Sequence, residues 1–369
     1  MSLRSVRVAA AFLALVVSVV CFLACGQKAP SGVPAGTIYS LTYGPITLGP
    51  GVEQTQCIVV PLGNPSPIHV GGIHDVLSNG SHHMIVYESS DTTPTPTPFD
   101  CQPFVDTLDP SKGQTLVVTQ KKDDTLDFPP GVGITLAANQ MIRIELHAIN
   151  PGAEAIQVQA TTNFITMSDA DYQYEAGFLF IGDPDITIPP NSNIQLGPIF
   201  FQVPDDYAQS QFFAITGHEH QLGTDVTVSV ASSASDPGTS VYDVPGWLWS
   251  EPATVPFSPP FTIPSGGGFT FTCNWTNTTD ETVKFGESAN DEMCFFWAYY
   301  YPSLGSRVCM HSDQYGGIDM CCPGPSLICD IIQSEIDDGG TFGSKGGGGD
   351  PPPTAAATDR AGPVLSTSP

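Results

Sequence analysis

Five histidines of this sequence stand at positions where their imidazoles could bind metal ions. His82 and His83 are adjacent in NGSHHMIVYE, and His147 lies in MIRIELHAIN. His218 and His220 form an H-x-H pair in ITGHEHQLG. Side chains two positions apart on a β-strand point to the same face, so both imidazoles of the pair can reach one ion without backbone distortion. The pair therefore indicates a metal site, with two unrelated surface histidines as the alternative.

The adjacent pair needs an irregular backbone. In a regular strand His82 and His83 point to opposite faces, so a shared ion requires a local twist or the use of different ring nitrogens. The SNGS segment just before them is rich in turn-forming residues, which makes such irregularity inexpensive. A turn-edge pair without a role is the alternative.

The strand that contains His147 alternates between apolar and polar residues. Its apolar face is predicted to lie in the core and carries Ile142, Ile144 and Leu146. Its polar face carries Arg143, Glu145 and His147. On that face Glu145 could accept a hydrogen bond from a metal-bound imidazole, although a solvated or ion-paired carboxylate is the more common situation. A single histidine on a polar face is also usually solvated, so His147 matters only together with the others.

Met293 offers a softer ligand at the start of an aromatic run. The stretch NDEMCFFWAYYY, residues 290–301, predicts a buried strand in which Met293 and Cys294 point to opposite faces. One face carries Met293, Phe295, Trp297, Tyr299 and Tyr301, and the other carries Cys294, Phe296, Ala298 and Tyr300. If this strand neighbours the H-x-H strand, two imidazoles and a thioether make a mixed site that suits copper, because thioether sulfur favours Cu(I). A methionine that only fills the core is the alternative.

The elements that must position these residues are β-strands. Short runs rich in Val, Ile, Thr, Phe and Tyr recur between clusters of Gly, Pro, Asn and Asp, and long helical patterns are absent from the sequence. The 369 residues include 37 Gly and 35 Pro, and only 13% of them are charged. The predicted fold class is all-β. A net charge of −26 with only 11 Lys and Arg argues against nucleic acid and anionic lipid surfaces as partners.

The N-terminus is predicted to be a secretory signal, residues 1–25. Arg4 and Arg7 precede an apolar run that is too short to span a membrane. The letters FLACG resemble a lipobox, which would make Cys25 the lipidated first residue of the mature chain. We therefore expect an exported protein of the cell envelope, attached to the membrane only through lipid. An ordinary cleaved signal, giving a periplasmic or secreted protein, is the alternative.

Two β domains are predicted for the mature chain, each near the size of one β-sandwich. The polar segment SDADYQY, residues 168–174, marks the boundary between them. The predicted segments are a tether (residues 26–36), an N-terminal domain (37–167), a C-terminal domain (168–330) and a tail disordered by composition (331–369).

Export makes the cysteines candidates for disulfides. Of the ten, Cys21 lies in the signal and Cys25 is the lipidation candidate. An even number remains: Cys57, Cys101, Cys273, Cys294, Cys309, Cys321, Cys322 and Cys329. Spacing alone does not give their connectivity.

The order of these motifs resembles the copper type II, ascorbate-dependent monooxygenases, the family of peptidylglycine α-hydroxylating monooxygenase and dopamine β-monooxygenase. HHM, a strand histidine, HEHQLG and DEMC before an aromatic run follow one another over about residues 55–302. The resemblance implies two jelly-roll-like antiparallel β-sandwich domains that face each other across a cleft. It also implies two copper ions per chain, with dioxygen, a small-molecule substrate and ascorbate or another one-electron donor as partners.

The resemblance assigns roles by position. One copper site, which stores and delivers an electron, would consist of His82, His83 and His147. The catalytic site, where dioxygen binds and the substrate is hydroxylated, would consist of His218, His220 and Met293. The family's disulfides would be Cys57–Cys101 and Cys273–Cys294. The pairing of the last four cysteines is left open by the resemblance.

The chain departs from the amidating members of this family in its expected substrate pocket. Those enzymes bind a peptide carboxylate through an arginine two residues before the H-x-H pair, where this chain has Thr216. Phe295 and Trp297 occupy positions that carry polar, substrate-contacting residues in the amidating enzyme. We therefore expect these three residues to contact a small, apolar or aromatic substrate.

Two other classes of function remain possible. A copper-binding envelope lipoprotein that sequesters or transfers copper without turnover would keep the ligands but would need no shaped pocket beside Met293. A metal-free module of two sandwiches that binds a glycan or a protein would make all six ligands incidental.

Overall fold

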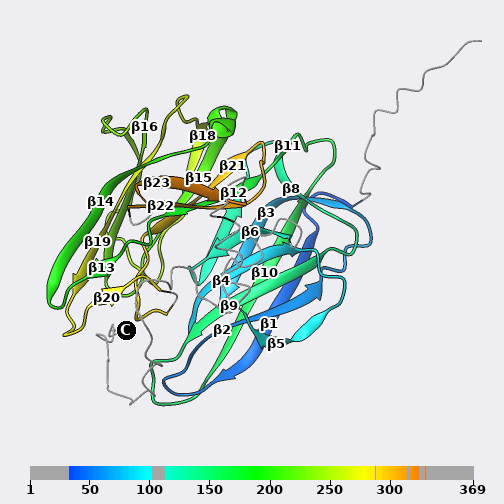
Figure 1. Cartoon of the computed structure of the whole chain (residues 1–369). Helices are drawn as coiled ribbons and strands as arrows, with labels where there is room; N and C mark the ends of the chain where they lie inside the picture. Colours follow the sequence, from blue (N-terminus) through cyan, green and yellow to red (C-terminus); the bar gives the residue numbers. More distant parts are fainter. Residues whose placement is uncertain (1–32, 102–112, 287, 314–315, 324–328, 330–369) are drawn as a thin grey trace, which may run out of the picture. The chain divides into compact units, whose positions relative to one another are not determined.

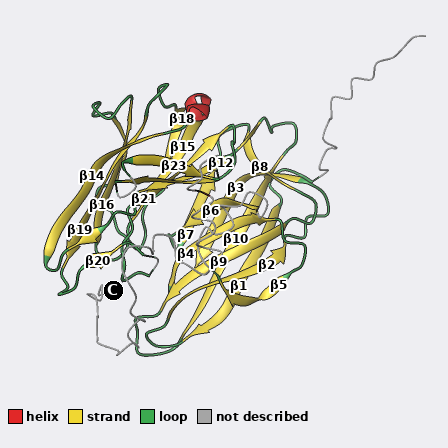
Figure 2. Cartoon of the chain, viewed as in Figure 1, coloured by secondary structure: helices red, strands yellow, loops and turns green. Residues whose placement is uncertain are grey.

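The structure is a computed structural model that describes residues 33–101, 113–286, 288–313, 316–323 and 329. Nearly all regular elements of these residues are β-strands, and a short 3₁₀ helix, η2 (Asp205–Gln209), lies between β14 (Ser192–Gln202) and β15 (Gln211–His218) (Figure 1, Figure 2). The high strand content confirms the all-β prediction. Among them, no helix is long and apolar enough to cross a membrane. The predicted signal with Cys25 and the predicted tail from residue 331 lie outside the described residues.

Two sheets make up the first half of the described chain (Figure 1). One has the order β1 (Ile38–Leu48), β10 (Ile156–Met167), β3 (Ile68–Leu77), β8 (Val132–Leu136), β11 (Tyr174–Glu175), with β7 (Asp123–Asp127) also paired to β3. The other has the order β5 (Thr95–Asp100), β2 (Glu53–Pro61), β9 (Met141–Ile149), β4 (Ser81–Ser89), β6 (Gly113–Thr119). Pairing is antiparallel except between β11 and β8.

The second half is built around a six-stranded sheet. Its order is β18 (Val255–Phe261), β15 (Gln211–His218), β21 (Phe295–Tyr301), β12 (Gly177–Gly182), β22 (Arg307–Ser312), β23 (Ile318–Cys322). A four-stranded sheet has the order β14 (Ser192–Gln202), β19 (Gly268–Asn277), β16 (Gly223–Ala231), β17 (Thr239–Asp243). A small ribbon pairs β13 (Thr187–Ile188) with β20 (Val283–Lys284). The sheets form a sandwich-like, mainly antiparallel fold, while the jelly-roll connectivity stays a prediction.

Strand β21 divides its side chains between two hydrophobic cores, as the period-2 pattern predicted. Phe295, Trp297, Tyr299 and Tyr301 belong to the core that they share with the first half. Cys294, Phe296, Ala298 and Tyr300 belong to the core inside the second half. The Tyr299 hydroxyl also accepts a hydrogen bond of 3.2 Å from the Val118 backbone N–H of the first half. The two halves therefore share a core, and both lie in one compact unit; the predicted boundary at residue 168 stays a prediction.

Both disulfides implied by the resemblance are present. Cys57 pairs with Cys101 and Cys273 pairs with Cys294. The pairing that was left open is Cys309–Cys321 and Cys322–Cys329. The first of these joins residues directly opposite each other on β22 and β23.

Candidate metal centre

A β-bulge in β4 brings the adjacent histidines to one side of the sheet. Ser81 is opposite Ala148 and His83 is opposite His147, so the pairing of β4 with β9 shifts by one residue at His82. Such a bulge removes the strict alternation of faces. The predicted backbone irregularity is therefore confirmed.

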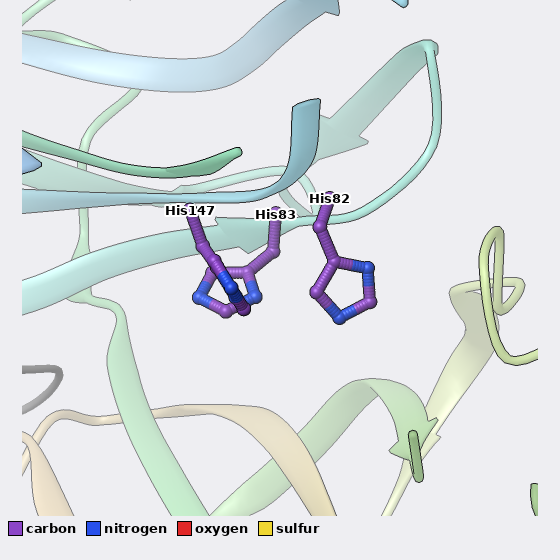
Figure 3. Close-up of side chains that lie close together, drawn as sticks. All are labelled: His82, His83 and His147. Carbon is purple, nitrogen blue, oxygen red and sulfur yellow. The ribbon is translucent and has the colours of Figure 1, made fainter. Parts of the chain in front are cut away.

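The three first-half imidazoles form a compact group. Ring centroids are 5.2 Å apart for His82 and His83, 5.2 Å for His82 and His147, and 4.9 Å for His83 and His147. One nitrogen of each ring lies within 4.8 Å of the others, which is a spacing that could hold one metal ion. Figure 3 shows the three rings extending from the same side of the strands.

The H-x-H pair also has the predicted arrangement. His218 is the last residue of β15, His220 follows it, and their ring centroids are 5.1 Å apart. Glu219 between them turns away and accepts a 2.9 Å hydrogen bond from the Asn274 backbone N–H. Both imidazoles consequently lie together, while the intervening carboxylate lies against β19.

The two groups of histidines meet in one cluster. The His82 ring centroid lies 6.4 Å from that of His218 and 6.0 Å from that of His220. His83 and His218 are also 6.4 Å apart. The resemblance implies two sites that face each other across a cleft, whereas here the rings of both halves are within contact distance. We call these five residues, His82, His83, His147, His218 and His220, the histidine cluster.

Met293 lies two residues before β21, the strand that pairs with the H-x-H strand β15. Strands β15 and β21 are antiparallel partners, with His218 opposite Phe295. The half-buried Met293 follows directly on from this paired region and packs against the core shared by the two halves. The same segment touches the pair directly, since His220 Nδ1 lies 3.1 Å from the Asp291 carbonyl oxygen.

Glu292 fastens the Met293 segment to the turn after β15. Its buried carboxylate accepts hydrogen bonds from the backbone N–H groups of His220 (2.9 Å) and Leu222 (2.7 Å) and from the Trp275 indole N–H (2.9 Å). Burial raises the pKa of Glu292 to about 7, against the effect of these donors. The sequence alone did not indicate this function of Glu292.

The ring nitrogens show which atoms remain available to a metal. His147 Nε2 is 2.8 Å from Glu53 Oε1, and His218 Nδ1 is 3.0 Å from Gln120 Oε1. With His220 Nδ1 also engaged, the opposite nitrogen of each of these rings is left to bind a metal.

Three further ring nitrogens indicate whether the histidine cluster suits a bound metal ion. His82 Nε2 and both ring nitrogens of His83 are buried without a hydrogen-bond partner among the described residues. Buried polar atoms normally have partners, because leaving one unsatisfied costs free energy. A bound ion would provide the missing interaction. A donor set of imidazoles with a nearby thioether fits copper.

Burial favours the neutral, metal-binding form of four histidines of the cluster. It lowers the pKa values of His82, His83 and His218 well below the usual value, with neighbouring histidines adding to the effect. The pKa of His220 falls to about 3 for the same main reason. Neutral imidazoles bind metals without first releasing a proton.

Glu145 is buried, so it is not the solvated carboxylate that was one of the two ordinary expectations, whereas the ion-paired alternative is compatible with its position near His83. The Tyr87 hydroxyl donates a 2.8 Å hydrogen bond to it, and the sulfurs of Cys57 and Cys101 lie within 4.8 Å of a carboxylate oxygen. These groups cover the strand face that alternation alone marked as polar. Glu145 Oε1 is 3.8 Å from His83 Nε2, and burial raises the pKa of Glu145 to about 7.

The three predicted substrate-contacting residues are enclosed in this structure. The Thr216 and Thr254 hydroxyls are 2.9 Å apart, and the Phe295 ring stacks on Phe180 at 4.8 Å. Trp297 reaches the cluster, with its ring 5.8 Å from that of His218. Their contact with a substrate stays a prediction.

Sequence reasoning missed a further aromatic residue beside the cluster. Trp249, in the connection between β17 and β18, lies with its ring 5.2 Å from that of His82. The only signal for it was the aromatic segment GWLW.

A family model matches the second half of the chain. Residues 174–318 match the family model described as copper type II ascorbate-dependent monooxygenase, C-terminal domain. The matched stretch contains His218, His220 and Met293, together with the Cys273–Cys294 disulfide. The match shows that this stretch is similar to the C-terminal domain of copper-dependent monooxygenases, and it specifies neither substrate nor reductant.

Similarity to solved structures is too low to support any argument. The chain is similar over 73% of its length to PNGase F, a glycosylasparaginase from Flavobacterium meningosepticum, at 10% identity, 97% coverage of that chain and a TM-score of 0.33. It is similar over 74% of its length to the major capsid protein P2 of bacteriophage PM2, at 10% identity, 94% coverage of that chain and a TM-score of 0.28.

Proposed function

We propose that this protein is an exported copper monooxygenase that hydroxylates a C–H bond of a small apolar or aromatic substrate. The observation that carries the proposal is the convergence of five buried imidazoles, two of them in a stretch that matches the copper monooxygenase C-terminal domain. Lipidation at Cys25 would hold the enzyme at the membrane surface of the cell envelope.

Two copper ions are proposed to bind in the histidine cluster. His82, His83 and His147 would hold one ion, and His218, His220 and Met293 would hold the other. Bound copper supplies one-electron redox chemistry and the activation of dioxygen. The net reaction consumes one C–H bond, dioxygen, two electrons and two protons, and it yields an alcohol and water. Ascorbate or another one-electron donor would deliver the electrons one at a time.

The chain's own residues prepare the site for this chemistry. Glu53, Gln120 and the Asp291 carbonyl each fix the orientation of one imidazole. Glu292 fixes the segment that carries Met293. Enclosure of the rings excludes bulk water, which protects reactive species from side reactions.

The surroundings of His218 support an apolar substrate. Thr216 stands where the amidating enzymes carry an arginine, and its hydroxyl is already paired with that of Thr254. Phe180, Phe295 and Trp297 form a stacked aromatic group next to His218. A charged peptide carboxylate would find no guanidinium from Thr216, so a glycine-extended peptide is not the proposed substrate.

A copper-binding protein without turnover is the second candidate. The enclosure of all five histidines favours it, because none is more than 8% exposed and a substrate needs access. The two candidates differ in ascorbate-dependent oxygen consumption, which only the enzyme would show once a suitable apolar substrate is supplied.

The first experiment for both candidate functions is to measure the number of copper ions bound per chain. The full chain, produced in an oxidising compartment, is expected to bind two copper ions, and His82→Ala or Met293→Ala should each remove about one. His74→Ala is the matched control, because this half-exposed histidine pairs with Asp123 on β7, outside the cluster. A folded protein with intact disulfides that binds no copper would refute the metalloprotein proposal.

A further inference from the structure

Gln120 reaches from the first half of the chain to a histidine of the second. It directly follows β6 and is 2% exposed. Its side-chain oxygen lies 3.0 Å from His218 Nδ1, across 98 residues of sequence. With the Gln120 oxygen as acceptor, His218 Nδ1 carries the proton and its Nε2 presents a lone pair. The orientation of a second-half ligand thus depends on a first-half residue.

Glu53 makes the reverse connection. Its Oε1 is 2.8 Å from Nε2 of His147, which belongs to its own half. The same oxygen accepts a 2.8 Å hydrogen bond from the Ala289 backbone N–H, and Oε2 accepts one of 3.1 Å from the Ser288 hydroxyl. Ser288 and Ala289 begin the loop that leads to Met293. One carboxylate therefore holds a first-half ligand and the loop of a second-half ligand.

We propose that Gln120 and Glu53 are positioning residues that make each copper site depend on contact between the two halves. This inference rests on the proposed copper sites and adds the coupling between them. Gln120 acts on the second site through His218. Glu53 acts on the first site through His147 and on the second through the loop at 288–289.

The enclosed setting makes these contacts effective. A hydrogen bond to the remote nitrogen of a metal-bound imidazole fixes its tautomer and ring orientation, and loss of such a partner typically lowers metal affinity 10–100-fold. Gln120 is buried, so water cannot readily replace its oxygen if the side chain is removed. Its amide nitrogen is buried without a hydrogen-bond partner among the described residues, which leaves the contact to His218 as the side chain's visible role.

The test is stepwise titration of the copper-free full chain with Cu(I) against a competing chelator. Gln120→Leu should weaken one of the two binding steps about 10–100-fold and leave the other unchanged. Glu53→Leu should weaken both steps. Gln120→Glu and Glu53→Gln each retain an acceptor oxygen and should restore most of the affinity. Gln114→Leu is the matched control, because Gln114 lies on β6 and bonds to Glu88 instead of a histidine.

A spectroscopic readout separates positioning from general damage. Pulsed EPR of the Cu(II) protein measures the quadrupole coupling of the remote imidazole nitrogens, which depends on their hydrogen bonds. Gln120→Leu should change one such coupling, whereas Gln114→Leu should change none. Thermal unfolding of each variant then shows whether the fold is retained.

The outcomes are distinct. Unchanged affinities and unchanged couplings in folded Gln120→Leu and Glu53→Leu proteins would overturn the coupling while leaving the copper sites intact. A loss confined to one step in Glu53→Leu would refute its dual role. Absence of copper binding in the unaltered protein would overturn the proposed function itself, and the coupling with it.

Discussion

Glu292 provides a direct test of how the Met293 segment is held in place. Glu292→Leu removes the acceptor of three hydrogen bonds and leaves the His220 N–H, the Leu222 N–H and the Trp275 indole N–H without it. His220 and Trp275 are buried, whereas Leu222 is partly exposed and its N–H can turn to water. Each buried donor left unsatisfied costs about 1–3 kcal/mol, so we expect a loss of about 2–6 kcal/mol.

The loss is measured by thermal unfolding of the copper-free chain with its disulfides intact. An unfolding entropy of about 2.1 cal/mol/K per residue makes 1 kcal/mol correspond to roughly 1.5 °C for a chain of this length, so Glu292→Leu should lower the midpoint by at least about 3 °C. Copper binding at the His218, His220 and Met293 site should weaken in parallel. Glu292→Gln keeps one acceptor oxygen, so its unfolding midpoint should lie between those of Glu292→Leu and the unaltered protein.

The control is Glu88→Gln on β4, since Glu88 is partly exposed and bonds to the Gln114 side chain. Glu88→Gln should change the free energy of unfolding by less than about 1 kcal/mol. The reasoning fails if the Glu292→Leu protein unfolds within 1 °C of the unaltered one and still binds two copper ions.

Three further results are expected. Burial raises the pKa of Asp75 to about 6 from its ordinary value of 3.8, so the folded state loses about 2 kcal/mol of stability as pH rises from 4 to 7. Asp75→Asn should abolish that part of the pH dependence in urea unfolding, and an unchanged slope would contradict it. Replacing both Cys273 and Cys294 by serine opens a loop of 21 residues and should cost about 3 kcal/mol in the same assay. Because the Trp249 ring lies 5.2 Å from His82, Cu(II) should quench less fluorescence in Trp249→Phe; equal quenching would place the ion elsewhere.

Alternation along single strands was the most reliable guide from the sequence. It predicted which side chains of β21 enter each core, and it predicted that His218 and His220 lie together while Glu219 turns away. These features depend on neighbours along one strand, where the geometry repeats every two residues. The bulge at His82 is one of the two arrangements expected for an adjacent pair that shares an ion, the other being the use of different ring nitrogens.

The supporting residues could not be predicted in the same way. Glu53 meets His147 across 94 residues and Ala289 across 236, and Gln120 meets His218 across 98. No local pattern records such contacts, because they arise only when separate sheets pack together. Glu145 shows the converse error, since a residue on a polar strand face became buried once Tyr87 and a disulfide covered it.

The division of the β21 side chains between two cores limits how the protein can be cut into fragments. A fragment that began at residue 168 would expose Phe295, Trp297, Tyr299 and the Phe178 and Phe180 rings of β12 to solvent. Contiguous apolar surface of this kind promotes aggregation. The second half is therefore a poor candidate for expression alone or for transfer into another protein by gene fusion.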